Sequence, residues 1–198
     1  MHKKSILLTC FSLFIIVAFI TGCAGLMAKP TKGNFKAPIV SLSHVEVPYY
    51  TGYYYLSAKV KPTKGKAGNY GAPMMMAFIF DIENPNKYPV ELDGFKFSVM
   101  FEEFEVNTVT SPETMWIPAG KTNQIRVPAT FDTRQTLTTL LLPGAMKMKA
   151  RGQSPWEILE AWWTGVTDFS FPITVTEGAA IFKAGDLVEV GTFKATFP

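Results

Sequence analysis

The sequence predicts an antiparallel β-sandwich or barrel with a short helical insertion. From residue 39 onward, most of the chain alternates apolar and polar residues, which is typical of half-buried strands. Glycine, proline and asparagine turn signals divide this part into roughly seven or eight short strands. One segment, "SPWEILEAWWTG", has a helical pattern instead. We find no internal repeat and no second hydrophobic core, so residues 38–198 are expected to form one domain.

The strand pattern is clearest between residues 78 and 131. Phe78, Phe80 and Ile82 alternate with less apolar neighbours, and the "FKFSVMF" segment of residues 95–101 places its apolar side chains on one face. Residues 62–73 are rich in glycine and are expected to form a loop. "MWIPAGKTNQIRVPATF" predicts two short strands around a turn at Pro118-Ala119-Gly120, and strands resume at residue 169.

The helical insertion is expected at about residues 134–165. Ser154 suits the N-cap, Pro155 suits the first helical position and Glu157 completes a capping box. Gly165 can end this helix. One face of this helix is apolar and contains Trp156, Ile158, Leu159, Trp162 and Trp163. This face is expected either to pack across the open end of the sandwich or to contact a membrane or a partner protein.

The first 22 residues have the features of an export signal. Lys3 and Lys4 precede the apolar run Ile6–Ile20, which is shorter than a membrane span of about 20 residues. Ile20-Thr21-Gly22-Cys23 resembles the lipobox of bacterial lipoproteins, which implies that Cys23 is acylated and begins the mature chain. Several acyl chains give stable membrane anchoring. We therefore expect a lipid anchor at Cys23 and a flexible tether over residues 23–37.

The expected location is the cell envelope. In a cell with two membranes, Ala24 after the cysteine implies the outer membrane, with the domain facing the periplasm. The anchor makes a membrane the first expected partner.

Composition argues against several function classes. Of the 19 basic residues, Lys3 and Lys4 lie in the signal, and 16 acids oppose the remaining 17, so the mature chain is nearly neutral. No basic cluster suggests nucleic-acid binding. After Cys23, His44 is the only histidine and no cysteine remains, so neither a zinc cluster nor a Cys–His dyad can form. We expect a non-enzymatic protein without metal or cofactor.

Two prolines and two asparagines interrupt the strand-forming stretch "FIFDIENPNKYPVELDGF" at residues 78–95. Proline cannot donate to a sheet ladder, and asparagine favours turns. Asn84-Pro85-Asn86 and Pro89 therefore predict a turn, a bulge or a crossover between strands. A contact to a ligand is the alternative interpretation.

This stretch also resembles the WHy (water stress and hypersensitive response) domain of the second group of late embryogenesis abundant (LEA) proteins. The resemblance rests on an ordered set of residues, namely Asn84, Pro85, Asn86, Tyr88, Pro89, Gly94, and then Ile117, Pro118, Ala119 and Gly120. It implies a fibronectin type III or immunoglobulin-like sandwich. It also implies protection of proteins or membranes during drying or freezing.

A second hypothesis is a binding module for an envelope protein or lipid. The binding surface of such a module would be the tryptophan helix or the tyrosine cluster. The alternative interpretation of both features is that their side chains pack in the core or at the edge of the sandwich. The tyrosine cluster contains Tyr49, Tyr50, Tyr53, Tyr54 and Tyr55.

Overall fold

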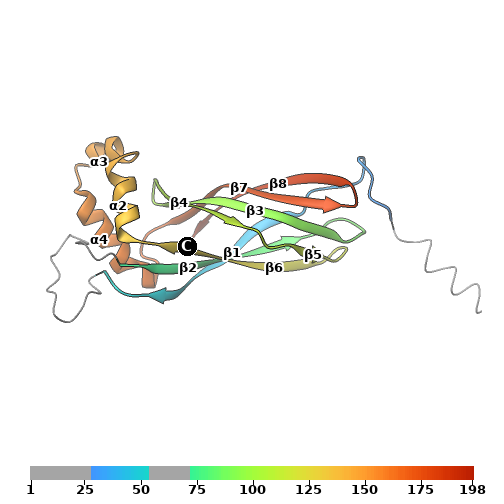
Figure 1. The fold of residues 1–198 in the computed structure, drawn as a ribbon, viewed down its shortest axis with the longest axis horizontal. Helices are drawn as coiled ribbons and strands as arrows, with labels where there is room; N and C mark the ends of the chain where they lie inside the picture. Colours follow the sequence, from blue (N-terminus) through green and yellow to red (C-terminus); the bar gives the residue numbers. More distant parts are fainter. Residues whose placement is uncertain (1–27, 54–71) are drawn as a thin grey trace, which may run out of the picture.

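Two antiparallel sheets lie face to face in the computed structural model, which describes residues 28–53 and 72–198 (Figure 1). The three-stranded sheet has the order β1 (Ile39–Tyr50), β2 (Met74–Glu83) and β6 (Thr122–Phe131). The five-stranded sheet has the order β4 (Phe104–Ser111), β3 (Val90–Phe101), β7 (Ile173–Ala184) and β8 (Leu187–Phe197), and β5 (Met115–Ile117) also pairs with β3. The described chain is therefore mostly β and sandwich-like, as predicted. Its assignment to the fibronectin or immunoglobulin type stays a prediction.

Aromatic rings from both sheets fill the space between them. The rings of Phe80 in β2 and Phe95 in β3 lie 4.9 Å apart, and Phe193 of β8 stacks on Phe95 at 4.8 Å. Gly178 lies at a register shift in β7, where a Cβ atom would come within 2.4 Å of the Phe193 ring. A glycine is needed there so that Phe193 can enter the core.

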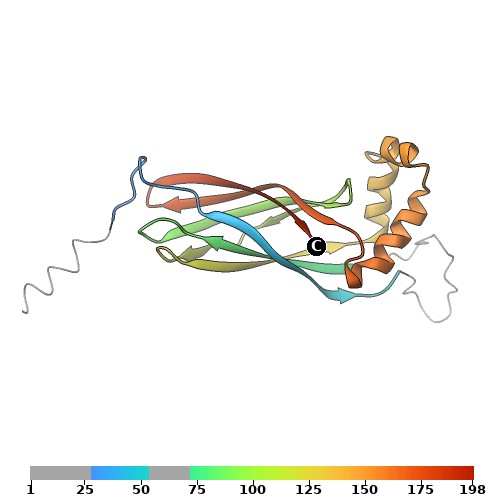
Figure 2. The ribbon, with the colours of Figure 1, turned by 180° about the vertical axis from the view of Figure 1, so that it is seen from behind.

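The helices α2 (Thr133–Leu141), α3 (Ala145–Arg151) and α4 (Pro155–Gly165) gather at one end of the sandwich, followed by the 3₁₀ turn η1 (Val166–Asp168) (Figures 1 and 2). Helix α4 begins as the sequence predicts, with Ser154 at the N-cap and a complete capping box to Glu157. Pro143-Gly144 separates α2 from α3. The predicted helical region at about residues 134–165 is confirmed.

The N-terminal segment leaves the sandwich at the end opposite the helices (Figure 2). Its second part packs against the domain, although the sequence suggested a flexible tether. Phe35 is buried, and Ala28 and Ala37 contact the core. The part of the segment from residue 28 onward therefore belongs structurally to the sandwich, because an apolar ring and hydrogen bonds described below fix it there.

Candidate functional site

The Asn84-Pro85-Asn86 motif forms the connection from β2 to β3. These two strands lie in different sheets, so the predicted crossover is confirmed. Asn84 is fully buried, and its side-chain amide donates to the carbonyls of Tyr88 at 2.9 Å and Ile117 at 3.0 Å. Its Oδ1 accepts from the backbone N–H of Asn86 at 3.0 Å. Asn84 therefore joins the crossover to the turn after β5.

Asn86 extends this network to the N-terminal segment. Its Oδ1 accepts from the Lys36 N–H at 3.0 Å, and its Nδ2 donates to the Lys36 carbonyl at 2.8 Å. This pair of bonds, which we call the Asn86 clasp, satisfies both backbone groups of a residue 50 positions earlier in the chain. The Asn86 carbonyl also accepts from the N–H of Gly120, whose left-handed backbone (φ +62°) closes the adjacent turn.

A tyrosine completes the attachment. Tyr88 is buried, its ring lies 6.4 Å from the Phe35 ring, and its hydroxyl donates to Asn34 Oδ1 at 2.9 Å. Burial raises the pKa of the Tyr88 hydroxyl, so it stays protonated and able to donate throughout the neutral range.

The other predicted motif residues lie around this network. Pro85, Pro89, Pro118 and Gly120 are exposed in the turns of the same end. Gly94 lies in β3, where a Cβ atom would come within 3.4 Å of the Ile181 side chain. Asparagine amides do not titrate near neutral pH and make poor nucleophiles, so this network can position backbone but offers no acid–base chemistry. Its geometry supports an architectural role.

For the tyrosine cluster and the tryptophan helix the sequence left packing and an interaction surface as alternatives, and most of these residues that the structure describes are packed. Tyr53, Trp162 and Trp163 are each less than 5% exposed, and Trp156 and Tyr50 are half-buried. Tyr49, at 53% exposed, remains at the surface. The tryptophan face of α4 therefore packs on the end of the sandwich, because the rings of Phe101 and Phe104 offer Trp162 an apolar site there.

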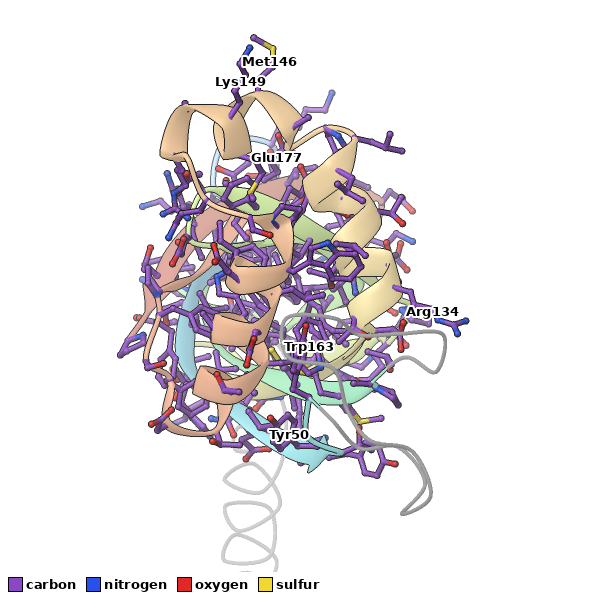
Figure 3. The ribbon with its side chains drawn as sticks, turned by 90° about the vertical axis from the view of Figure 1, so that its left-hand side faces the viewer. Tyr50, Arg134, Met146, Lys149, Trp163 and Glu177 are labelled. Carbon is purple, nitrogen blue, oxygen red and sulfur yellow. The ribbon has the colours of Figure 1, made fainter. Side chains whose placement is uncertain are left out.

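Trp163 fixes α4 to the end of the three-stranded sheet. Its Nε1 donates to the Ala72 carbonyl at 2.7 Å, just before β2. The Tyr50 hydroxyl at the end of β1 donates to the Trp163 carbonyl, and Figure 3 shows these two labelled residues near the same end of the helix. Burial of the Tyr50 hydroxyl raises its pKa, and a backbone hydrogen bond from Tyr53 partly opposes that shift.

Some predicted residues lie outside the described ranges. These are the signal of residues 1–22, the lipidation candidate Cys23, and two tyrosines of the cluster, Tyr54 and Tyr55. Their predictions remain as stated from the sequence.

Acidic side chains do not assemble into a site in the described ranges. Glu102 and Glu103, at the β3–β4 turn, both pair with Arg151 of α3, at 2.5 and 3.0 Å. Residues 28–53 and 72–198 contain no cluster of three or more His, Cys, Asp or Glu side chains that could hold a metal ion. No helix in those ranges combines the length and the apolar composition needed to cross a bilayer.

The structure exposes other apolar residues that the sequence reasoning did not single out. Trp116 is 57% exposed in β5, and Leu142 and Met146 are 71% and 86% exposed where α2 meets α3. Figure 3 shows Met146 pointing away from the helical end. In β8, Val188 and Val190 are also exposed and pair with Lys183 and Ile181, although their alternation with Glu189 in the sequence would have favoured inward positions.

The network of the β2–β3 crossover falls inside a region with a known family pattern. Residues 80–177 match the family LEA_2, Late embryogenesis abundant protein. The match covers just under half of the chain and runs from β2 to β7, including both motif asparagines, the turn at Gly120 and the helices. The LEA-type character expected from the sequence is supported over this range. The WHy subtype stays a prediction.

Other comparisons add little. No curated protein matches the chain. Among solved structures, a protein from Archaeoglobus fulgidus is similar at 12% identity with a TM-score of 0.41, covering 79% of this chain and 94% of that one. A Bordetella pertussis chain described as ApaA is similar at 11% identity with a TM-score of 0.39, covering 82% and 93%.

Proposed function

We propose that this protein is a lipid-anchored, non-enzymatic envelope protein whose LEA-type domain protects proteins or membranes during drying or freezing. The match of residues 80–177 to the LEA family carries this proposal. The WHy subtype, the acylation of Cys23 and a position on the outer membrane facing the periplasm are parts of the same proposal.

The internal hydrogen bonding of the domain suits a protein that works when water is scarce. Buried polar groups need partners, and water often supplies them. Asn84 and Asn86 instead bond to carbonyls and N–H groups of the chain itself. Loss of bulk water removes none of these partners, so we propose that the domain acts in its folded form, as a surface-active shield.

Protection is tested with a labile enzyme taken through freeze–thaw cycles. We expect the chain from residue 23, carrying Cys23→Ser, to preserve more enzyme activity than an equal mass of albumin. Recovery no better than with albumin would contradict the protective role. The segment from residue 28 must be kept because Phe35 packs into the domain.

Anchoring is tested separately by feeding cells radiolabelled fatty acid. Label should enter the wild-type protein and be lost in Cys23→Ser. Equal labelling of both would overturn the anchor without affecting the protective role.

A binding module for an envelope protein is the second candidate. The exposed corner between α2 and α3, with Leu142 and Met146, favours this function and is a better candidate for the binding surface than the buried tryptophan face. A photo-reactive cross-linker at position 146 in intact cells should then capture one stoichiometric partner. Diffuse labelling would instead support the shield.

A further inference from the structure

An apolar surface covers the outer side of the five-stranded sheet near the end where the N-terminal segment leaves. Trp116, Glu91, Lys183 and Val188 are paired in one row across β5, β3, β7 and β8. Gly94, Ile181 and Val190 form the adjacent row. Paired residues of neighbouring strands lie on the same face, so the exposed apolar side chains of both rows form one surface. We call this surface the outer face; its members are Trp116, Ile181, Val188 and Val190.

The outer face is open to solvent. Trp116, Val188 and Val190 are 57%, 56% and 53% exposed, and Ile181 is 39% exposed. Ile181 lies against Gly94, which has no side chain to cover it. The charges between these residues are largely paired, because the Lys183 ammonium lies 2.6 Å from the Asp93 carboxylate. In the row of Trp116, Glu91, Lys183 and Val188, Glu91 is the acidic residue.

Exposed lysines surround the same end of the molecule. Lys36 is one partner of the Asn86 clasp and Lys87 follows the other in the chain, and the Lys121 carbonyl accepts from the Asn84 N–H. The set is Lys29, Lys32, Lys36, Lys87 and Lys121, and none of these lysines has an ion-pair partner in the described part of the chain. Acids also lie near this end, among them Asp186 in the β7–β8 turn, Glu83 at the end of β2 and the exposed Glu189 between Val188 and Val190.

Chain length keeps any lipid at Cys23 close to this end. Only five peptide units separate Cys23 from Ala28, where the docked segment starts, so the separation is at most about 17 Å even when fully extended. A lipid on Cys23 would therefore hold the lysine-bearing end, and not the helical end, against the bilayer (Figure 2).

We propose that the outer face and its surrounding lysines contact a bilayer rich in anionic phospholipid. Tryptophan favours the boundary between water and lipid, valine and isoleucine bury apolar area there, and each lysine near an anionic surface adds attraction. This inference deepens the proposed anchoring. The test below uses protein without an acyl chain, so the bilayer contact and the lipid anchor can each be contradicted without affecting the other.

The test is flotation of the chain from residue 23, carrying Cys23→Ser, with vesicles of phosphatidylcholine alone or mixed with phosphatidylglycerol. We expect binding to the anionic vesicles only, weakened by added salt. The double variant Trp116→Ser, Val188→Ser should lower the partition coefficient by about tenfold or more, since it removes two apolar contacts. Both side chains are exposed, so the thermal midpoint should stay near that of the parent chain.

A control removes two apolar residues from the opposite end, Leu142 and Met146, which are more exposed than Trp116 and Val188. Leu142→Ser with Met146→Ser should leave the partition coefficient unchanged. A loss of binding in this control with none in the outer-face variant would overturn the proposal and point to the α2–α3 corner. Absence of binding by the parent chain would overturn it as well.

The charge contribution has its own pair of variants. Lys32→Gln, Lys87→Gln, Lys121→Gln should weaken binding by about tenfold or more, whereas Arg134→Gln, Lys149→Gln at the helical end should have little effect. Residues 54–71 hold four further lysines outside the described ranges. Binding that survives both the lysine and the outer-face variants would overturn the proposal. A dimer in sedimentation that the outer-face variant dissociates, without vesicle binding, would do the same.

Discussion

At the scale of single residues, Asn84 has the most partners of the residues at the β2–β3 crossover. It is fully buried and bonds to the crossover, the turn after β5 and Asn86 through one short side chain. An aspartate or threonine of similar size could not supply two amide donors and an acceptor together. The choice of asparagine follows from this geometry.

Asn84→Ala is expected to lower the free energy of unfolding by about 3 kcal/mol, because it leaves buried carbonyls and an N–H without partners. Urea denaturation measures this change. Asn107→Ala is the control. Asn107 is half-buried and its side chain makes one hydrogen bond within the described ranges, to the Thr130 carbonyl, so its loss should cost about 1 kcal/mol or less. Equal losses in the two variants would contradict the role assigned to Asn84.

At the scale of elements, the strand and the helix start that depend on neighbouring residues in the sequence were predicted correctly. The alternation over residues 95–101 and the capping box at Ser154 both correspond to observed elements. The sequence could not show that Trp162 and Trp163 turn inward, because an apolar helical arc is the same for a core and for a surface. Their burial depends on Phe101, Phe104 and Ala72, which come from elements distant in sequence.

The two buried tryptophans of α4 should respond differently to removal of their N–H groups. Trp163 Nε1 donates to Ala72, whereas Trp162 Nε1 has no acceptor among the described residues. Trp163→Phe should therefore lower the free energy of unfolding by at least about 1 kcal/mol more than Trp162→Phe does. Denaturant titration of both variants tests the difference, and a greater loss in Trp162→Phe would show that α4 is held mainly by ring packing.

At the scale of the whole molecule, the helices and the N-terminal segment occupy opposite ends of the sandwich (Figure 1). The sequence placed a flexible tether up to residue 37, since small, polar and glycine residues are typical of linkers. It could not show that Asn86 would bind the backbone of Lys36, because that contact needs the finished fold. The domain consequently starts closer to the proposed anchor than composition suggests.

Release of this segment is expected when the Asn86 clasp is removed. Asn86→Ala deletes both bonds to Lys36, so local opening should increase and trypsin should cut after Lys32 and Lys36 about tenfold faster. Asn107→Ala is the control for a mild global effect, and urea denaturation shows how much of the change is global. An unchanged cleavage rate in Asn86→Ala would mean that the Phe35 packing and the Tyr88–Asn34 hydrogen bond fix the segment without the clasp.

The Asn86 clasp also affects how the protein responds to a pulling force on its N-terminus. A pull on the N-terminus loads the Tyr88–Asn34 hydrogen bond, the Phe35 contact and the two Lys36 bonds before it reaches β1, whose pairing with β2 begins at Ile39. The segment can therefore detach first, lengthen the free chain and absorb extension while both sheets stay intact. A membrane that shrinks or shears as it dries would then strain this small attachment before it strains the sandwich.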